Sequence, residues 1–190
     1  MLVHLRRAVV VSIVFFVLLG LAYPLLITGV GQAFFNRQAN GDLVSSRHGY
    51  VGSSLIGQHW PGPRWFQGRP DADNPMATGP QNYGPKSKLL LDFARAQVRR
   101  LEKEGIRPTN ELVTGSGSGV DPDISPRSAY AQVDAVARAN HLPVAAVRHL
   151  VATHVIGPYW GFLGSPYVNV FRLNQSLAHL ESGATGASRG

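Results

Sequence analysis

Cysteine is absent from the 190 residues of the sequence, and this absence excludes disulfides, thiolate metal sites and cysteine nucleophiles. Acidic residues are scarce as well: 11 Asp and Glu stand against 18 Lys and Arg, which leaves a net charge of +7. The basic residues are scattered rather than clustered, so nucleic acid is not an expected partner. Without disulfides, an exported domain depends on a hydrophobic core or on a partner for its stability.

Charge is also missing from a long segment near the N-terminus, because no charged residue occurs between Arg7 and Arg37. As a helix, residues 8–27 would span roughly 30 Å, the hydrocarbon thickness of a bilayer. Arg6 and Arg7 precede this run, so the positive-inside tendency predicts a cytoplasmic N-terminus and an extracytoplasmic remainder. The sequence therefore predicts a single transmembrane helix over residues 8–30.

A cleavable secretory signal is the competing interpretation of the same residues. Gly20 and Ala22 supply only a weak small-x-small cleavage site, and the apolar run continues to Ile27, beyond a typical signal core. We therefore favour the anchor. Its candidate contacts with partner helices are Gly20, Pro24, Gly29 and Gly31. The alternative for residues 28–35 is a helix end at the membrane interface.

The remaining residues predict an α/β (α+β) fold, with a loop-rich extracytoplasmic domain over residues 31–181. Apolar spacing predicts about three helices, at residues 87–104, 126–140 and 143–155, and β-branched and aromatic content predicts a small sheet with strands at 50–56 and 167–173. Residues 1–7 would form the cytoplasmic N-terminus and residues 182–190 a disordered tail.

Aromatic rings and arginines are concentrated in residues 58–70, where proline and glycine prevent a long regular element. Trp and Arg are enriched at protein interfaces, although the same composition suits a packed loop. The sequence predicts a partner-contact loop here, with Trp60, Trp65, Phe66 and Arg69 as its contact residues.

Glycine and serine alternate in residues 113–126 and suggest a backbone nest for an anion. A phosphate loop would end in Gly-Lys-Ser/Thr, but Val120 and Asp121 follow here. We favour a tight loop in which Asp121 and Asp123 bond backbone amides ahead of a helix cap at Ser125.

No catalytic or metal-binding constellation is evident in the sequence. The Gly-x-Ser-x-Gly pattern of hydrolases is missing, and His149 and His154 would lie on different sides of a helix. No metal site and no directly bound cofactor are therefore expected.

The motifs of the chain, taken in order, resemble the C subunits of Kdp-type potassium-transporting ATPases. The matching segments are YPLLITGVGQAFFNRQANGDLV, GSSLIGQHW, WFQGRPDA, GPQNYGPKSKLL, VTGSGSGVDPDISPRSAYAQVDAVARAN and GSPYVNVFRLNQSL. Together with the apolar run that leads into the first segment, the resemblance extends from about residue 8 to residue 180, and the order of the segments makes it specific. Two departures are Tyr83, where the family usually has Leu, and Asp123, where His or Asn is usual.

The resemblance implies a non-catalytic subunit of an ATP-driven, high-affinity potassium importer in the bacterial inner membrane. It implies three partners: a channel-like A subunit that admits potassium, a P-type B subunit that hydrolyses ATP, and a small F subunit. Family members are regarded as assembly factors and as catalytic chaperones that raise the ATP affinity of the B subunit. Direct nucleotide binding would involve the loop residues Ser116, Gly117, Ser118 and Gly119.

The predicted orientation conflicts with direct ATP binding, because Arg6 and Arg7 place the domain outside the membrane and ATP lies inside. An indirect effect, through helix contacts that bias the conformations of the B subunit, remains compatible with it. We expect the domain to cap the outer mouth of the A subunit while the anchor clamps the membrane parts. The alternatives are an extracytoplasmic hydrolase or a single-pass scaffold unrelated to a pump.

Overall fold

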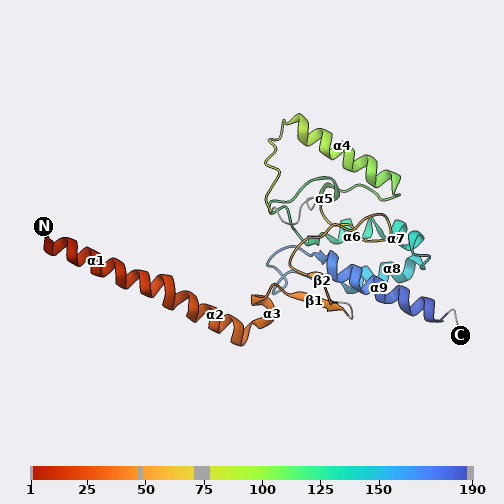
Figure 1. Cartoon of the computed structure of the whole chain (residues 1–190). Coiled ribbons are helices and arrows are strands. Elements are labelled where there is room, and N and C mark those ends of the chain that lie inside the picture. The colour runs from red at the N-terminus through yellow and green to blue at the C-terminus, as the bar shows by residue number, and fades with distance from the viewer. Residues whose placement is uncertain (1, 47–48, 71–77, 188–190) are drawn as a thin grey trace. The chain divides into compact units, whose positions relative to one another are not determined.

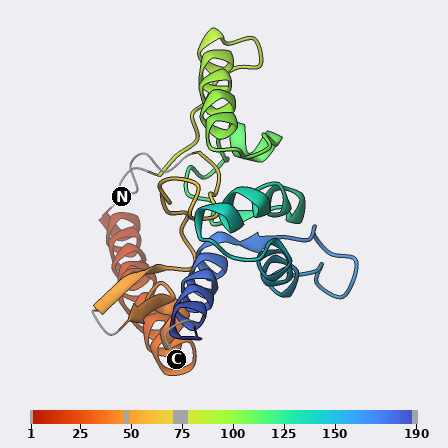
Figure 2. The same cartoon turned by 90° about the vertical axis from the view of Figure 1, so that its right-hand side faces the viewer.

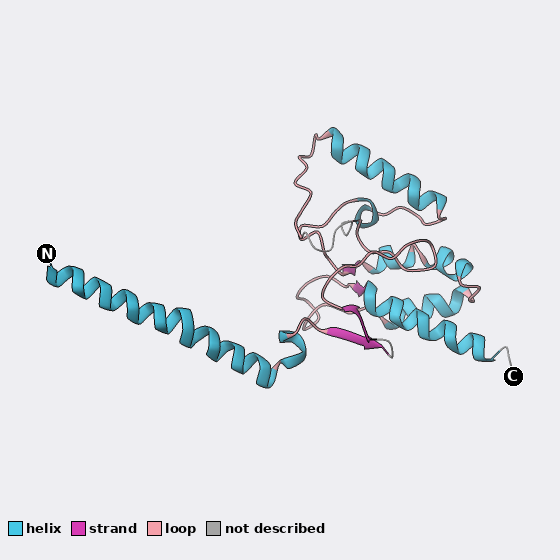
Figure 3. Ribbon diagram, in the orientation of Figure 1, coloured by secondary structure: helices cyan, strands magenta, loops and turns pink. Residues whose placement is uncertain are grey.

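The computed structural model describes residues 2–46, 49–70 and 78–187 (Figure 1). The chain forms two compact units, residues 1–53 and residues 54–190. Helices and loops dominate, and the strands form two small sheets (Figure 3). The predicted α+β layout with one long N-terminal apolar helix is therefore confirmed.

The first unit begins with a continuous helix, Leu2–Phe34, of 33 residues. It consists of α1 (Leu2–Val17), the π-helical turn η1 (Leu18–Ala22) and α2 (Tyr23–Phe34), and none of its residues is buried. At 1.5 Å per residue the helix is about 50 Å long, so it exceeds the hydrocarbon core of a bilayer. It is long and apolar enough to cross a membrane, and it extends beyond the predicted span of 8–30 at both ends.

The π turn has a local cause in Pro24. Proline has no N–H to donate to the carbonyl of the residue four positions earlier, here Gly20, and its ring crowds that carbonyl. The N–H of Tyr23 instead bonds the carbonyl of Leu18, five residues back. The widened turn therefore accommodates the proline without ending the helix.

The helix is followed by α3 (Asn36–Ala39) and by a hairpin of β1 (Leu43–Ser46) and β2 (Gly49–Ser53). The strands are antiparallel, with Leu43 opposite Ser53 and a bulge between Val44 and Ser45. The strand predicted at 50–56 thus ends three residues early, because its pairing partner β1, which the sequence did not reveal, is only four residues long.

The second unit contains most of the regular structure. Its elements are α4 (Lys88–Lys103), α5 (Asn110–Val113), β3 (Asp123–Ile124), α6 (Pro126–Tyr130), α7 (Val133–Ala139), α8 (Val144–Thr153), β4 (Val168–Asn169) and α9 (Val170–Ala187). Strands β3 and β4 pair antiparallel. Figures 1 and 2 show α4 standing beside the other helices of this unit, joined to them by loops.

Three sequence predictions differ from the observed elements of this unit. The helix predicted at 126–140 is divided into α6 and α7 at Gln132, whose carboxamide bonds residues outside the helix. The strand predicted at 167–173 ends at Asn169, because the Asn169 side chain accepts a hydrogen bond from the N–H of Arg172 and caps α9. Helix α9 also continues past residue 182, where a disordered tail was expected; residues 188–190 lie outside the described residues.

The main core lies between α6–α9 and the aromatic loop that precedes residue 70. Its fully or almost fully buried members are Phe66, Ile124, Ala129, Val133, Val136, Ala137, Val147, Val151, Val168, Val170, Leu173 and Leu177. A second, smaller cluster joins α4 to α7 and consists of Leu101, Ile106, Leu112 and Ala135. The loops of the candidate site are held between these two clusters.

Candidate functional site

The four residues of the predicted partner-contact loop lie mostly inside the second unit. Phe66 is fully buried in the main core. The ring of Trp60 lies 5.4 Å from that of Trp65 and 6.0 Å from that of Phe171, and both tryptophans are half-buried. The aromatic content of this loop therefore serves packing to a large extent.

Two buried carboxamides fix the backbone of the same loop. Gln132 accepts from the N–H of Gln67 at 2.7 Å and donates to its carbonyl at 2.9 Å. Asn174, on α9, makes the equivalent pair of bonds with the main chain of Phe66. Each amide side chain thus substitutes for a neighbouring strand and satisfies main-chain groups that have no access to water.

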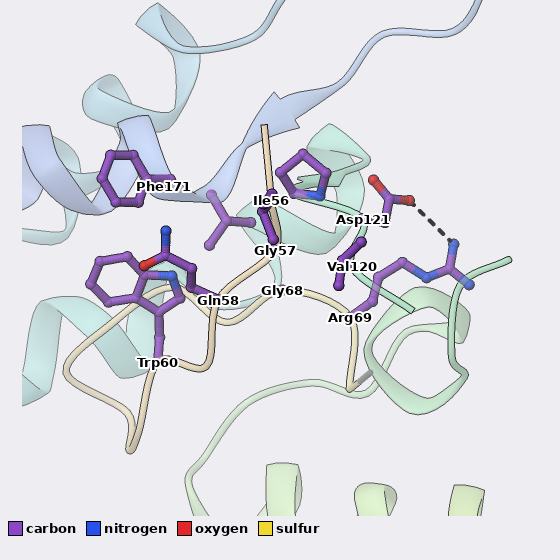
Figure 4. A pocket seen from close by; sticks show the side chains of 11 residues that line it. Ile56, Gly57, Gln58, Trp60, Gly68, Arg69, Val120, Asp121 and Phe171 are labelled. Carbon is purple, nitrogen blue, oxygen red and sulfur yellow. Dashed lines mark ion pairs between the residues drawn. The ribbon is translucent and has the colours of Figure 1, made fainter. Parts of the chain in front are cut away.

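Arg69 joins this loop to the glycine–serine loop. Its guanidinium donates to the carbonyl oxygens of Gly115 and Thr114 and lies 4.0 Å from the carboxylate of Asp121 (Figure 4). Like Phe66, Arg69 therefore has an internal role, which the sequence could not distinguish from an interface role.

The glycine–serine loop, 115–120, bonds largely to itself. Ser116 Oγ accepts from the N–H of Gly119 at 2.9 Å, and Ser118 Oγ accepts from the N–H of Val120 at 3.2 Å. Asp121 accepts from the N–H of Asp123, as predicted, and Ser125 caps α6 by accepting from the N–H of Ser128. Asp123 instead accepts from the side chain of Asn169.

A shallow hollow lies where the two loops meet, between the Trp60 and Phe171 rings on one side and the Arg69–Asp121 ion pair on the other (Figure 4). Its cavity volume is about 10 Å³, the room of a single water molecule. A nucleotide does not fit this space.

Two carboxyl groups near the loops have shifted pKa values. Burial raises the pKa of Glu111, but hydrogen bonds from the side chain and N–H of Ser125 and from Ser128 outweigh it, so the pKa is lowered overall. Burial raises the pKa of Asp123, and the hydrogen bond from Asn169 offsets only part of that effect. Both groups are bonded inside the fold.

Within the part of the chain that the structure describes, no group of three or more His, Asp or Glu could hold a metal ion. His154 Nε2 lies 2.9 Å from Ser176 Oγ, and its Nδ1 lies 2.8 Å from the carbonyl of Leu150. This pair connects α8 to α9. Neither residue lines the hollow of Figure 4.

The largest aromatic side chains that face solvent in the second unit lie in a segment for which no site was predicted from the sequence. Residues 156–167 form a tight hairpin between α8 and β4, and Trp160 and Phe162 at its tip are 85% and 78% exposed. The signal that could have found it is an uncharged run from Val155 to Phe171 that contains the sequence Trp-Gly-Phe-Leu-Gly at residues 160–164.

The family model described as "K+-transporting ATPase, c chain" (KdpC) matches residues 5–179. The chain belongs to the KdpC family. A relative named potassium-transporting ATPase KdpC subunit, from Sorangium cellulosum, is 46% identical over 186 residues, covering 93% of this chain and 98% of the relative. Relatives of the same name from Methylobacterium nodulans and Allorhizobium ampelinum are 43% and 45% identical, covering 95% and 93% of this chain and 98% and 96% of their own lengths.

KdpC membership agrees with the layout of the molecule. The matched region includes almost all of the long apolar helix as well as the second unit through most of α9. The chain is thus related over nearly its whole length to subunits of a potassium-transporting ATPase, which removes the alternatives of a hydrolase or scaffold unrelated to a pump.

Proposed function

We propose that the chain is a non-catalytic subunit that assembles and stabilises the potassium-transporting ATPase. The observation that carries this proposal is that buried and half-buried polar side chains of the second unit are bonded within the fold. The carboxamides of Gln132 and Asn174, the guanidinium of Arg69 and the carboxylate of Glu111 are all engaged in holding loops in place. Such a unit is suited to presenting a fixed surface to partners.

The partners proposed for the chain are the channel-like A subunit, the P-type B subunit and the small F subunit. The long apolar helix crosses the inner membrane with its N-terminus in the cytoplasm, and the second unit lies outside. Arg6 and Arg7, at the N-terminal side of the apolar run, support this orientation. Because the chain has no cysteine, single introduced thiols can test this orientation.

The orientation test compares His4→Cys with Asn110→Cys, both at exposed positions. In right-side-out membrane vesicles, a membrane-impermeant maleimide should label the thiol at position 110 at once. It should label the thiol at position 4 only after permeabilisation. The reverse pattern would contradict the proposed topology.

An effect of the chain on ATP affinity is proposed to be indirect, through contacts with the P-type subunit. The self-bonded hydroxyls of Ser116 and Ser118, and the lack of space beside Val120 and Asp121, support this view. Ser118→Ala in the complete ATPase should leave the apparent KM for ATP unchanged. A KM raised tenfold would instead indicate direct nucleotide contact.

Assembly itself can be tested by removing the second unit while keeping the anchor, with a chain that ends at Ser53. The shortened chain should co-purify with less of the ATPase, and the complex should lose potassium-stimulated ATP hydrolysis. Full assembly and full activity with the anchor alone would contradict a role of the second unit. The full-length chain purified in parallel is the control.

A further inference from the structure

The hairpin at residues 156–167 has a defined backbone. Ile156 and Tyr167 exchange both main-chain hydrogen bonds, at 2.9 and 3.0 Å, and Tyr159 and Leu163 exchange two more, each at 2.9 Å. Figure 2 shows this segment, in blue, extending away from the helices of its unit. Four cross-hairpin bonds make it a formed element rather than a loose loop.

The tip of the hairpin exposes apolar side chains to solvent. Trp160 is 85% exposed, Phe162 78%, Tyr159 65% and Leu163 53%. The rings of Trp160 and Phe162 are 6.4 Å apart. A contiguous exposed patch of this kind on a folded protein marks an interaction site.

The backbone at the tip is strained in order to hold this arrangement. Trp160 has φ +51°, in the left-handed region that large side chains avoid, and Gly161 follows at φ +83°. Glycine at position 160 would adopt the same turn without strain. Retaining a tryptophan there costs stability, and strain of this kind is typical of functional positions.

We propose that this hairpin, which we term the aromatic hairpin, docks into an apolar pocket on another subunit of the potassium-transporting ATPase. The inference rests on the proposed function, because it requires that the chain joins that complex. Beyond the proposed function, it names the element of the chain that makes the contact and states that the receiving surface is apolar. Trp160 is the central anchor, since buried tryptophans dominate the energetics of protein interfaces.

A protein pocket fits the aromatic hairpin better than a lipid surface. No charged residue occurs from Val155 to Phe171, so the tip offers no cation for lipid headgroups. A fluid bilayer also requires no fixed backbone, whereas a pocket benefits from a preorganised one. KdpC relatives are named as subunits of a potassium-transporting ATPase, which supplies a protein partner.

The size of the patch indicates that it acts together with a second contact. Three aromatic side chains and one leucine bury roughly 500 Å² when they are enclosed. A stable interface buries about 800 Å² on each partner. The long apolar helix, if it is held in the same complex, would provide the remaining contact and raise the effective concentration of the hairpin at its pocket.

Trp160→Gly separates docking from folding, because it removes the indole and relieves the strained φ. Wild-type and variant full-length chains with different tags are co-expressed with the ATPase, and their ratio in the purified complex is measured. We expect the variant to be incorporated at least about 30-fold less than the wild type. Trp160→Phe should recover most of the loss, and Leu89→Ala, at a 64% exposed position on α4, should compete equally with wild type.

Equal incorporation of Trp160→Gly and wild type would overturn the inference. If the wild-type chain itself did not co-purify with the ATPase, the proposed function would fail instead, so the two failures are distinguishable. The thermal unfolding temperature of Trp160→Gly should be no lower than that of wild type.

A single thiol identifies what covers the hairpin. Ser165→Cys, at an exposed position beside the tip, is alkylated in three settings: the chain alone in detergent, the chain in phosphatidylcholine–phosphatidylglycerol vesicles, and the complete ATPase. We expect alkylation to be at least tenfold slower in the complete ATPase than in either of the other two settings. Equal protection in the vesicles would assign the hairpin to lipid, and protection in detergent would assign it to a second copy of the chain. Either result would overturn the inference.

Discussion

The main chains of Gly57 and Asp121 are in direct contact. A Cβ placed on Gly57 would lie only 2.6 Å from the carbonyl oxygen of Asp121. The N–H of Gly57 also donates to the carbonyl of Val120 at 2.7 Å. No side chain fits between these segments. This contact connects the start of the aromatic loop to the end of the glycine–serine loop.

Gly57→Ala should therefore destabilise the second unit, by about 1–3 kcal/mol, because a rigid backbone must move to admit the methyl group. Gly117→Ala is the matched control, since a Cβ there meets nothing within 4 Å. Urea unfolding of the full chain in mild detergent, followed by circular dichroism, measures both. Similar unfolding free energies for the two variants would refute the close packing.

Asn174→Leu should be among the most destabilising single changes in α9. The substitution keeps the volume of the side chain but leaves the N–H and carbonyl of Phe66 without partners in the core. Two unsatisfied main-chain groups cost about 2–5 kcal/mol together. The same denaturation measurement applies, with Asn110→Leu at an exposed position as the control; a loss below 1 kcal/mol would contradict the pairing.

The stabilising effect of Glu111 should be lost in acid. Its folded pKa lies below the ordinary value, so its charged form adds stability at pH above the unfolded pKa of about 4.3. That contribution is lost as the pH falls through the lower folded pKa. Wild type should therefore unfold at a higher temperature than Glu111→Gln at pH 6, and the difference should vanish toward pH 2.5.

Asp123 should show the opposite pH dependence. Its folded pKa is raised by burial, so the protonated form favours folding below the unfolded pKa of about 3.9. This contribution is lost as the pH rises through the folded pKa. Asp123→Asn can still accept from Asn169 and carries no charge, so its melting temperature should exceed that of wild type at pH 7 and approach it at pH 3.5. A variant less stable than wild type at pH 7 would contradict the assigned cause.

The sequence predicted those elements whose signals are local. Helix α4 was expected at 87–104 and occupies Lys88–Lys103, because its apolar spacing, Ser87 before it and Gly105 after it, at φ +73°, are all readable in the chain. The long N-terminal helix was predicted for the same reason, from an uninterrupted apolar run. The end of this helix at Phe34 was not predicted, because the small residues that precede it have a weak helical propensity.

Elements decided by distant contacts were not predicted. Gln132 interrupts a helical pattern because its amide serves Gln67, which is 65 positions away. Val170 begins a helix despite β-branched neighbours, because it packs in the core with Leu173 and Leu177. Tertiary packing overrides local propensity at such positions.

In the candidate site, too, local features could be predicted from the sequence, whereas features that depend on distant contacts could not. Composition drew attention to the aromatic loop and the glycine–serine loop, but it could not tell that Phe66 is internal while Trp160 is exposed. Both are aromatic residues in glycine-containing segments. Only the fold determines which of the two packs inward.

The π turn at Leu18–Ala22 determines how the two halves of the long apolar helix, α1 and α2, are rotated relative to each other. A π turn contains one residue more than the α turn it replaces, so α2 is rotated by about 100° relative to its position in an uninterrupted α-helix. An apolar stripe on α1 therefore continues on a different side of α2. The helix can present separate sides to two neighbours, one along each half, and deleting a single residue of η1 would bring both halves onto one side.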